Sequence, residues 1–187
     1  FASNRQAYSR TLSQAEQALF EDDSSYFMDL YVMNADDSDV TQLTRSPGYD
    51  GGPFYSPDGS KITWRRFNPD GNSAEIWTMD ADGSNQRQLT ADGMVAWAPY
   101  YHPSGEYLIY SSNQLGHANF ELFIVDTEGA RAPVRVTNTD GTDILPVFSP
   151  AGDQLAWSTT RTADGTSQLH IADWNHEQAL SLLAEAR

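Results

Sequence analysis

Residues 53–59 read Pro-Phe-Tyr-Ser-Pro-Asp-Gly. The phrase returns as Pro-Tyr-Tyr-His-Pro-Ser-Gly at residues 99–105 and as Pro-Val-Phe-Ser-Pro-Ala-Gly at residues 146–152. The first prolines of successive copies are 46 and 47 residues apart. Proline presets φ at one turn position and glycine supplies a positive φ later, so the phrase predicts a tight turn. A repeat of this length with turn residues at fixed offsets indicates stacked supersecondary units.

Short runs that alternate apolar and polar residues follow each copy of the phrase. The run after the turn predicts a second strand, at residues Lys61–Arg65, Tyr107–Ser111 and Gln154–Ser158. A third strand is expected at residues 75–80, 121–126 and 168–173, and a short fourth strand at residues 87–90 and 134–137. β-Branched and aromatic residues with a period of two favour strands. Four antiparallel strands per unit of about 45 residues are typical of a β-propeller blade.

Both ends of the chain depart from this repeat. Residues Phe1–Arg5 match the second strand of a blade, and the last unit has no fourth strand. We therefore expect an all-β propeller portion of about four blades over residues 1–174, with the first and last blades incomplete. A helical insertion is expected at about residues 6–25, where Ser13 and Glu16 form a capping-box pattern. Residues 175–187 are expected to be a C-terminal helix, or a linker to a domain outside this chain, with Asn175 and Gln178 as another capping box.

Charge and composition restrict the classes of partner. The formal net charge is −15, which argues against nucleic acid and anionic membrane surfaces as partners. The chain has no cysteine, so disulfides and thiolate chemistry are excluded. No apolar run is long enough to span a membrane.

The repeated pattern resembles the TolB-type β-propeller repeat over nearly all of residues 26–173. The shared features are an apolar third strand ending in Asp, a following Leu-Thr pair, and the Ser-Pro-Asp-Gly turn. WD-repeat blades are the nearest rival, but their Gly-His and Trp-Asp dipeptides are absent. The resemblance implies an exported bacterial protein, periplasmic or secreted, with an accessory binding role. A narrower resemblance is found in residues 98–105, 118–122 and 171–177, which look like parts of TolB-type domains in exported bacterial proteins. In some of those proteins the propeller precedes a zinc aminopeptidase-like domain.

Candidate ligands lie three residues before the leading proline of two blades. Asp50 and Asp143 occupy this position, which faces the channel of a propeller, and Ala96 occupies it in the blade between them. Two carboxylates there have the chemistry to bind a cation such as calcium or a basic peptide. Polar residues that only hold ordered water are the alternative. No resident cofactor and no metal-ligand set are expected otherwise, because the acidic glycine turns, such as Asp80–Ser84, lack the ligand spacing of a calcium loop and fit hairpin turns better.

Five further residues complete the predicted channel-mouth site. Arg65 and Arg66 form an adjacent basic pair that has the chemistry to bind a carboxylate, although ion pairing between blades is the simpler interpretation. Trp97 and Tyr100 lie near the inner strand, where a recognition surface and core packing are both open. His102 replaces the serine of the repeat phrase, and a role in the turn is sufficient to explain it.

These observations favour a non-catalytic scaffold that binds a protein or peptide. The alternative is an accessory domain that orients substrate for a zinc-dependent peptidase or another hydrolase. A sugar- or polyuronate-active propeller is a third possibility, since some TolB-like relatives are lyases, but no histidine cluster supports it. We also expect either self-association of the arc or N-terminal blades that close the ring, because an open arc exposes unpaired strand edges.

Overall fold

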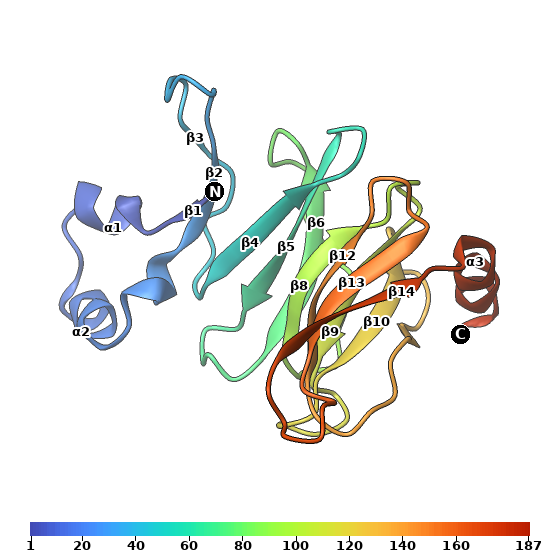
Figure 1. Ribbon diagram of the computed structural model, residues 1–187. Coiled ribbons are helices and arrows are strands. Elements are labelled where there is room, and N and C mark those ends of the chain that lie inside the picture. The colour runs from blue at the N-terminus through green and yellow to red at the C-terminus, as the bar shows by residue number, and fades with distance from the viewer.

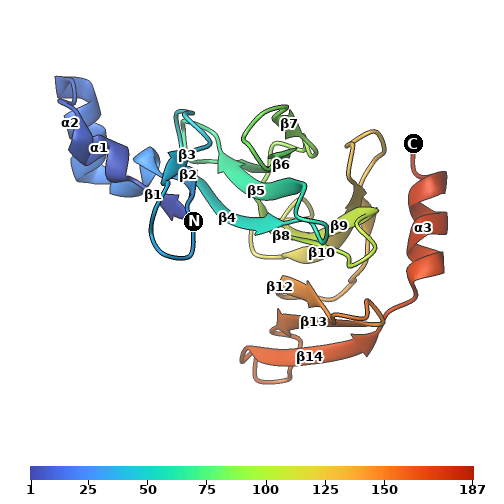
Figure 2. The same cartoon turned by 90° about the horizontal axis from the view of Figure 1, so that it is seen from above.

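Four antiparallel β-sheets follow one another along the chain as the blades of an open arc (Figures 1 and 2). The computed structural model describes residues 1–187. The predicted all-β propeller with incomplete first and last blades is confirmed. The first blade comprises β1 (Ala2–Ser3), β2 (Asp29–Val32) and β3 (Thr41–Gln42). The second comprises β4 (Asp50–Tyr55), β5 (Lys61–Phe67), β6 (Ala74–Asp80) and β7 (Arg87–Gln88). The third comprises β8 (Ala96–Tyr101), β9 (Tyr107–Ser112), β10 (Glu121–Asp126) and β11 (Val134–Arg135). The fourth comprises β12 (Asp143–Phe148), β13 (Gln154–Thr159) and β14 (Gln168–Asp173).

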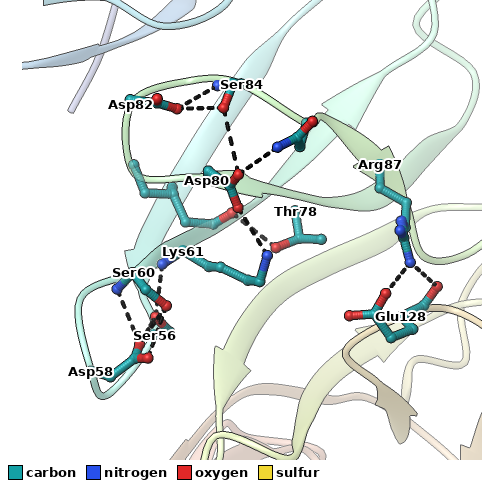
Figure 3. Close-up of polar contacts among 12 residues, drawn as sticks. Ser56, Asp58, Ser60, Lys61, Thr78, Asp80, Asp82, Ser84, Arg87 and Glu128 are labelled. Carbon is teal, nitrogen blue, oxygen red and sulfur yellow. Dashed lines mark hydrogen bonds and ion pairs between the residues drawn. The ribbon is translucent and has the colours of Figure 1, made fainter.

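The repeated phrase is the hairpin between the first two strands of a blade, as expected. Its glycines Gly59, Gly105 and Gly152 have φ of 72°, 77° and 75°. In the second blade the Asp58 carboxylate accepts hydrogen bonds from the Ser56 hydroxyl at 2.6 Å and from the Ser60 N–H at 3.0 Å (Figure 3). The phrase thus satisfies its own polar groups and closes the hairpin locally.

Each innermost strand carries a β-bulge at the residue before its proline. The register of the strand pair shifts there in the second, third and fourth blades. The bulged residues Gly52, Ala98 and Leu145 have φ of 63°, 51° and 57°. Proline has no N–H for the ladder, so a bulge at this point lets the strand bend without losing an otherwise formed bond.

A carboxylate and a threonine lock the third strand of a blade to the end of its fourth strand. Thr90 of the Leu-Thr pair donates to Glu75 at 2.6 Å and accepts from the Ile76 N–H at 2.9 Å. The same arrangement recurs with Thr44 and Asp29 in the first blade. It recurs in the third blade with Thr137 and Glu121. Burial raises the pKa of Glu75, and the threonine bond opposes that rise. The lock explains the repeated acidic residue and the Leu-Thr pair in physical terms.

Apolar clusters fill the spaces between neighbouring blades. Trp64, Tyr110 and Trp157, which recur at the repeat spacing, are 0 %, 0 % and 7 % exposed, so their predicted place in the core is confirmed. The cluster between the first and second blades comprises Leu30, Leu43, Ile62, Trp64 and Met79. The cluster between the second and third comprises Ile76, Leu89, Ala96, Tyr101, Leu108, Tyr110, Phe123 and Val125. The cluster between the third and fourth, which also includes two residues of the C-terminal helix, comprises Tyr107, Ile109, Leu122, Ile124, Phe148, Leu155, Trp157, Ala179 and Leu183.

The insertion in the first blade forms three helical segments rather than the single helix expected. They are α1 (Arg5–Ser9), α2 (Gln14–Asp22) and the 3₁₀ helix η1 (Ser24–Phe27). The expected capping box begins α2, with Ser13 and Glu16 exchanging both bonds. Edge-to-face and tilted aromatic contacts of Phe20 with Tyr8 and Phe27 join the segments. In Figure 2 the insertion lies at the N-terminal end of the arc.

The C-terminal helix α3 (His176–Glu185) packs against the third and fourth blades (Figure 2). Asn175 caps it by accepting from the Gln178 N–H at 3.0 Å, whereas the Gln178 side chain does not complete the expected capping box. Ala179 and Leu183 enter the last interblade cluster. None of the helices has the length and apolar character that a membrane crossing needs.

Candidate binding site

A cleft of about 450 Å³ opens between the helical insertion and the loops of the second blade. The insertion contributes Leu19, Asp22, Asp23, Ser25 and Tyr26 to its lining. The second blade contributes residues 48–49 and 67–71, and the third contributes Trp97. The volume falls within the ~300–1,000 Å³ range of ordinary ligand sites. Three separate parts of the chain therefore build one concave surface.

Stacked and edge-on aromatic rings form one wall of the cleft. Tyr49 stacks on Phe67 with ring centroids 5.7 Å apart, and Phe67 meets Trp97 edge to face at 5.9 Å. The backbone sets this arrangement, because the Phe67 N–H donates to the Tyr49 carbonyl at 2.9 Å. Such pairs contribute ~0.5–1.5 kcal/mol each beyond the area they bury.

Arg65 braces the aromatic wall from behind. Its guanidinium carbon lies 3.7 Å from the centroid of the Trp97 ring and 5.0 Å from that of Tyr49, and Nη2 donates to the Tyr49 hydroxyl at 2.7 Å. Arg65 is 9 % exposed, no carboxylate pairs with it, and its Nε has no hydrogen-bond partner. Burial lowers the pKa of Arg65. The two rings thus replace an acidic partner, since a desolvated cation over an aromatic face gains about 2 kcal/mol or more.

Two adjacent glycines make room for this brace. A Cβ on Gly51 would lie 2.3 Å from the Tyr49 hydroxyl, and a Cβ on Gly52 would lie 2.4 Å from Nη1 of Arg65. Gly52 also has φ of +63°, at the bulge of β4. The Gly-Gly pair before Pro53 is therefore required by close approach as well as by backbone conformation.

The rim of the cleft is acidic. Asp22, Asp23 and Asp70 are exposed, and no lysine, arginine or histidine lines the cleft. Asp23 accepts from the Ser25 N–H at 2.8 Å, and its hydrogen bonds with Ser25 lower the pKa of its carboxyl. Asp70 accepts from the Asn72 N–H at 3.0 Å. Aromatic rings and carboxylates together are suited to bind a positively charged group.

Asp50 and Arg66, two residues of the predicted channel-mouth site, pair with each other. They lie opposite one another in the register of β4 and β5, and the guanidinium binds the carboxylate through two bonds of 2.7 and 2.8 Å. The Trp64 indole also donates to Asp50 at 3.1 Å, and Arg66 lies over the Trp77 ring at 4.5 Å. This ion pair joins two strands of one blade rather than two blades.

Asp143 has a similar environment in the fourth blade. It is fully buried and accepts from the Trp157 indole at 3.1 Å, from Arg161 at 2.6 Å and from the Thr139 hydroxyl at 3.1 Å. In the third blade, alanine and tyrosine replace this aspartate and tryptophan. Asp50 and Asp143 thus each accept hydrogen bonds from side chains of their own blade.

Tyr100 and His102 lie away from the cleft. Tyr100 packs edge to face with Phe54 of the second blade at 5.2 Å. His102 is 4 % exposed, contacts the Ser104 hydroxyl at 2.9 Å and the Gly152 carbonyl at 3.1 Å, and stacks on His176 of α3 at 4.5 Å. The structure therefore brings together Arg65 and Trp97 of the predicted set and places the other five elsewhere.

Sequence reasoning missed Phe67, Tyr26 and the three rim aspartates. The available signal was indirect, since insertions on repeat scaffolds often lie on the binding face. The Asn68–Gly71 loop, an acidic glycine turn of the same kind as Asp80–Ser84, lines the cleft.

The acidic turns at the opposite ends of the strands are satisfied internally. Asp82 accepts from the Ser84 N–H at 2.9 Å, and Asp80 pairs with Lys61 at 2.9 Å (Figure 3). Gly83 has φ of 89°. The hairpin-turn interpretation of residues 80–84 is confirmed.

Comparison with known proteins supports the architecture. The sequence model of the TolB β-propeller domain family matches residues 8–120. TolB from Acinetobacter baumannii superposes with a TM-score of 0.66 at 22 % identity, covering 80 % of this chain and 36 % of that one. A TolB-type protein from Agrobacterium tumefaciens gives 0.66 at 23 %, covering 78 % and 53 %. A puromycin-hydrolyzing peptidase from Mycobacterium tuberculosis gives 0.56 at 16 %, covering 78 % and 23 %.

The chain spans about a third to a half of the two TolB-type structures. No curated protein sequence matches it significantly. At these identities the structural matches show the fold, while function depends on the site.

Proposed function

This chain belongs to the TolB β-propeller domain family, and on that premise we propose that it is part of a non-catalytic scaffold that binds a protein or peptide in the cleft beside its helical insertion. The observation that carries the proposal is the braced aromatic wall. Arg65, Tyr49 and Trp97 are held by specific contacts, although an interblade core needs only apolar packing. A wall fixed before binding lowers the cost of ordering side chains on association.

The cleft is better suited to binding than to catalysis. Its lining has no histidine, lysine or paired acid and base that would move a proton, and its carboxylates lie on an exposed rim. The cleft has room for one or two side chains of a peptide, since its volume is about 450 Å³. Similarity to bacterial TolB proteins supports an exported bacterial protein, periplasmic or secreted, as the setting.

An accessory role in a larger hydrolase is the second candidate. The observation in its favour is the match to the mycobacterial peptidase, of which the matched propeller region is 23 %. In that case the same cleft would orient peptide substrate for a separate catalytic domain. Both candidates share peptide binding as the first step, so one experiment tests that step.

Peptide selection with matched tryptophan variants tests the proposal. Leu19 lines the cleft and is 42 % exposed, whereas Leu182 on α3 is equally exposed and lies outside the cleft. Peptides selected from a random displayed library on the immobilised chain are measured against Leu19→Trp and Leu182→Trp. We expect the tryptophan of Leu19→Trp to fill the cleft and weaken binding at least about tenfold. Leu182→Trp should bind like the parent chain. Selection of no peptide, or of peptides indifferent to Leu19→Trp, overturns the proposal.

A further inference from the structure

The cleft combines acidic charge with aromatic surface, and no basic group neutralises that charge within it. Asp22 projects from the end of α2, and Asp23 follows it directly. Asp70 approaches from the loop between β5 and β6. Carboxylates from two different parts of the chain therefore lie along one opening. The formal charge of the side chains that line the cleft is therefore negative, in a chain whose formal net charge is −15.

The chain itself shows how aromatic rings of its blades hold a guanidinium. Arg65 lies against Trp97 and Tyr49, Arg66 lies 4.5 Å over Trp77, and Arg161 lies 5.2 Å over Trp157. In the case of Arg65 the rings suffice without any carboxylate. A second guanidinium entering the cleft would meet the Tyr49, Phe67 and Trp97 wall together with the acidic rim.

We propose that the cleft is a pocket for an arginine side chain of the bound peptide, stacked on the aromatic wall and paired with the rim aspartates. This inference rests on the peptide-binding function proposed above and names its specificity. Arginine is favoured over lysine because a planar guanidinium stacks on rings and binds a carboxylate through two hydrogen bonds. The charge of Arg65 opposes the ligand, but it lies behind the wall, and three formal negative charges at the opening outnumber it.

Peptides that differ only in the charged group test the inference. The probes are Ala-Gly-X-Gly-Ala peptides blocked at both ends, in which X is arginine, lysine or citrulline, the neutral analogue of arginine with nearly the same shape. The chain is labelled with fluorotryptophan, and the ¹⁹F resonance of Trp97 is assigned with Trp97→Phe. We expect a saturable shift of that resonance with the arginine peptide, about tenfold weaker binding of citrulline, and weaker binding of lysine. Binding should weaken at high salt, as expected of exposed charges.

Charge-neutral variants locate the pairing. Asp22→Asn and Asp70→Asn should each weaken the arginine peptide about two- to fivefold and leave the citrulline peptide unchanged, because only the charged ligand loses a partner. Glu21→Gln is the matched control, since Glu21 also lies in α2 and is exposed but does not line the cleft. It should leave both peptides unchanged.

The outcomes distinguish failure of the arginine pocket from failure of the proposed peptide-binding function. If library peptides bind the cleft but the citrulline probe binds as tightly as the arginine probe, the arginine pocket is overturned and peptide binding stands. The arginine pocket is also overturned if the arginine peptide binds without moving the Trp97 resonance. The same holds if it binds Asp22→Asn and Asp70→Asn as tightly as the parent chain. If neither the probes nor any library peptide reaches the cleft, both proposals fall.

Discussion

Gly52, Ala98 and Leu145 show at single-residue resolution how the inner strands are bent. All three have positive φ and precede the proline of the repeat, although only the first is glycine. A side chain in the left-handed region costs roughly 1–2 kcal/mol. The bulge nevertheless persists in the second, third and fourth blades, because the proline that follows cannot join the ladder. The third and fourth blades therefore store backbone strain that the second avoids.

Replacing Ala98 by glycine should release this strain. Glycine tolerates φ of 51° freely, while its greater freedom in the unfolded chain costs ~0.5–1 kcal/mol. The net expectation is a gain of about 0.5–1 kcal/mol in the free energy of unfolding. Urea denaturation followed by tryptophan fluorescence measures the change.

Ala96→Gly is the matched control for that measurement. Ala96 lies two residues earlier in β8, is fully buried in an interblade cluster and has no positive φ. It should lose about 1.5 kcal/mol from entropy and the missing methyl group. If both variants lose the same amount, Ala98 stores no strain.

The candidate site was only partly predictable from its residues. Arg65 was predicted as part of a basic pair and Trp97 as a residue near an inner strand, but their contact depends on the packing of the second blade against the third. The Asp50–Arg66 pair follows from hairpin register, since these residues lie directly opposite each other. Sequence alone marks both charges, but the bulge that sets their register becomes visible only in three dimensions.

At the scale of elements, α3 completes the last interblade cluster. Ala179 and Leu183 of the helix pack there with Leu122 and Ile124 of β10 and with residues of the fourth blade. The four blades and the helix were predicted from turn phrases and capping residues, because these signals are local. The packing of α3 and the three-part insertion depend on distant contacts and were not.

Acid should weaken the region where α3 meets the third and fourth blades. His102 is buried there against His176, Tyr107 and Phe148, and burial, followed by repulsion from His176, lowers the pKa of His102. A folded-state pKa below the unfolded value of about 6.5 means that the unfolded chain binds the proton first. Stability is therefore lost as pH falls from about 6.5 through the lowered pKa. Between pH 7.5 and 5.5 the loss due to His102 is at most about 1.4 kcal/mol.

The comparison of His102→Asn with His117→Asn isolates this effect. Urea denaturation at pH 7.5 and 5.5 gives the pH-dependent loss of each variant relative to the parent chain. His117 lies exposed in a loop, so its variant should retain the full loss, while His102→Asn should lose less on acidification. Glu106, which lies 3.3 Å from His176, is present in both variants and cancels in the comparison. An equal pH dependence in both variants contradicts the assignment to His102.

At the scale of the whole molecule, the two ends of the arc differ in what they expose. The last blade presents Val147, Leu169 and Ile171, which are 42 %, 79 % and 69 % exposed. Register places Val147 and Ile171 opposite Ala156, with Leu169 two residues along β14, so the three share one face of the sheet. At the other end, Ala7 of α1 is buried beside the first blade. The last blade therefore carries both an apolar face and a strand edge without a neighbour, a combination that promotes association.

The chain of residues 1–187 in isolation should consequently self-associate through β14. Light scattering over a range of concentrations should give a mass above the 20.7 kDa of one chain. The double variant Leu169→Glu/Ile171→Glu should shift the mass toward 20.7 kDa, because burying two carboxylates in an apolar interface is costly. Leu115→Glu, at a loop residue that is 49 % exposed, should leave association unchanged and controls for added negative charge. A parent chain that stays monomeric at all concentrations would show that the exposed face of the last blade is tolerated in water. The expectation that a second arc closes the ring would then have no physical basis.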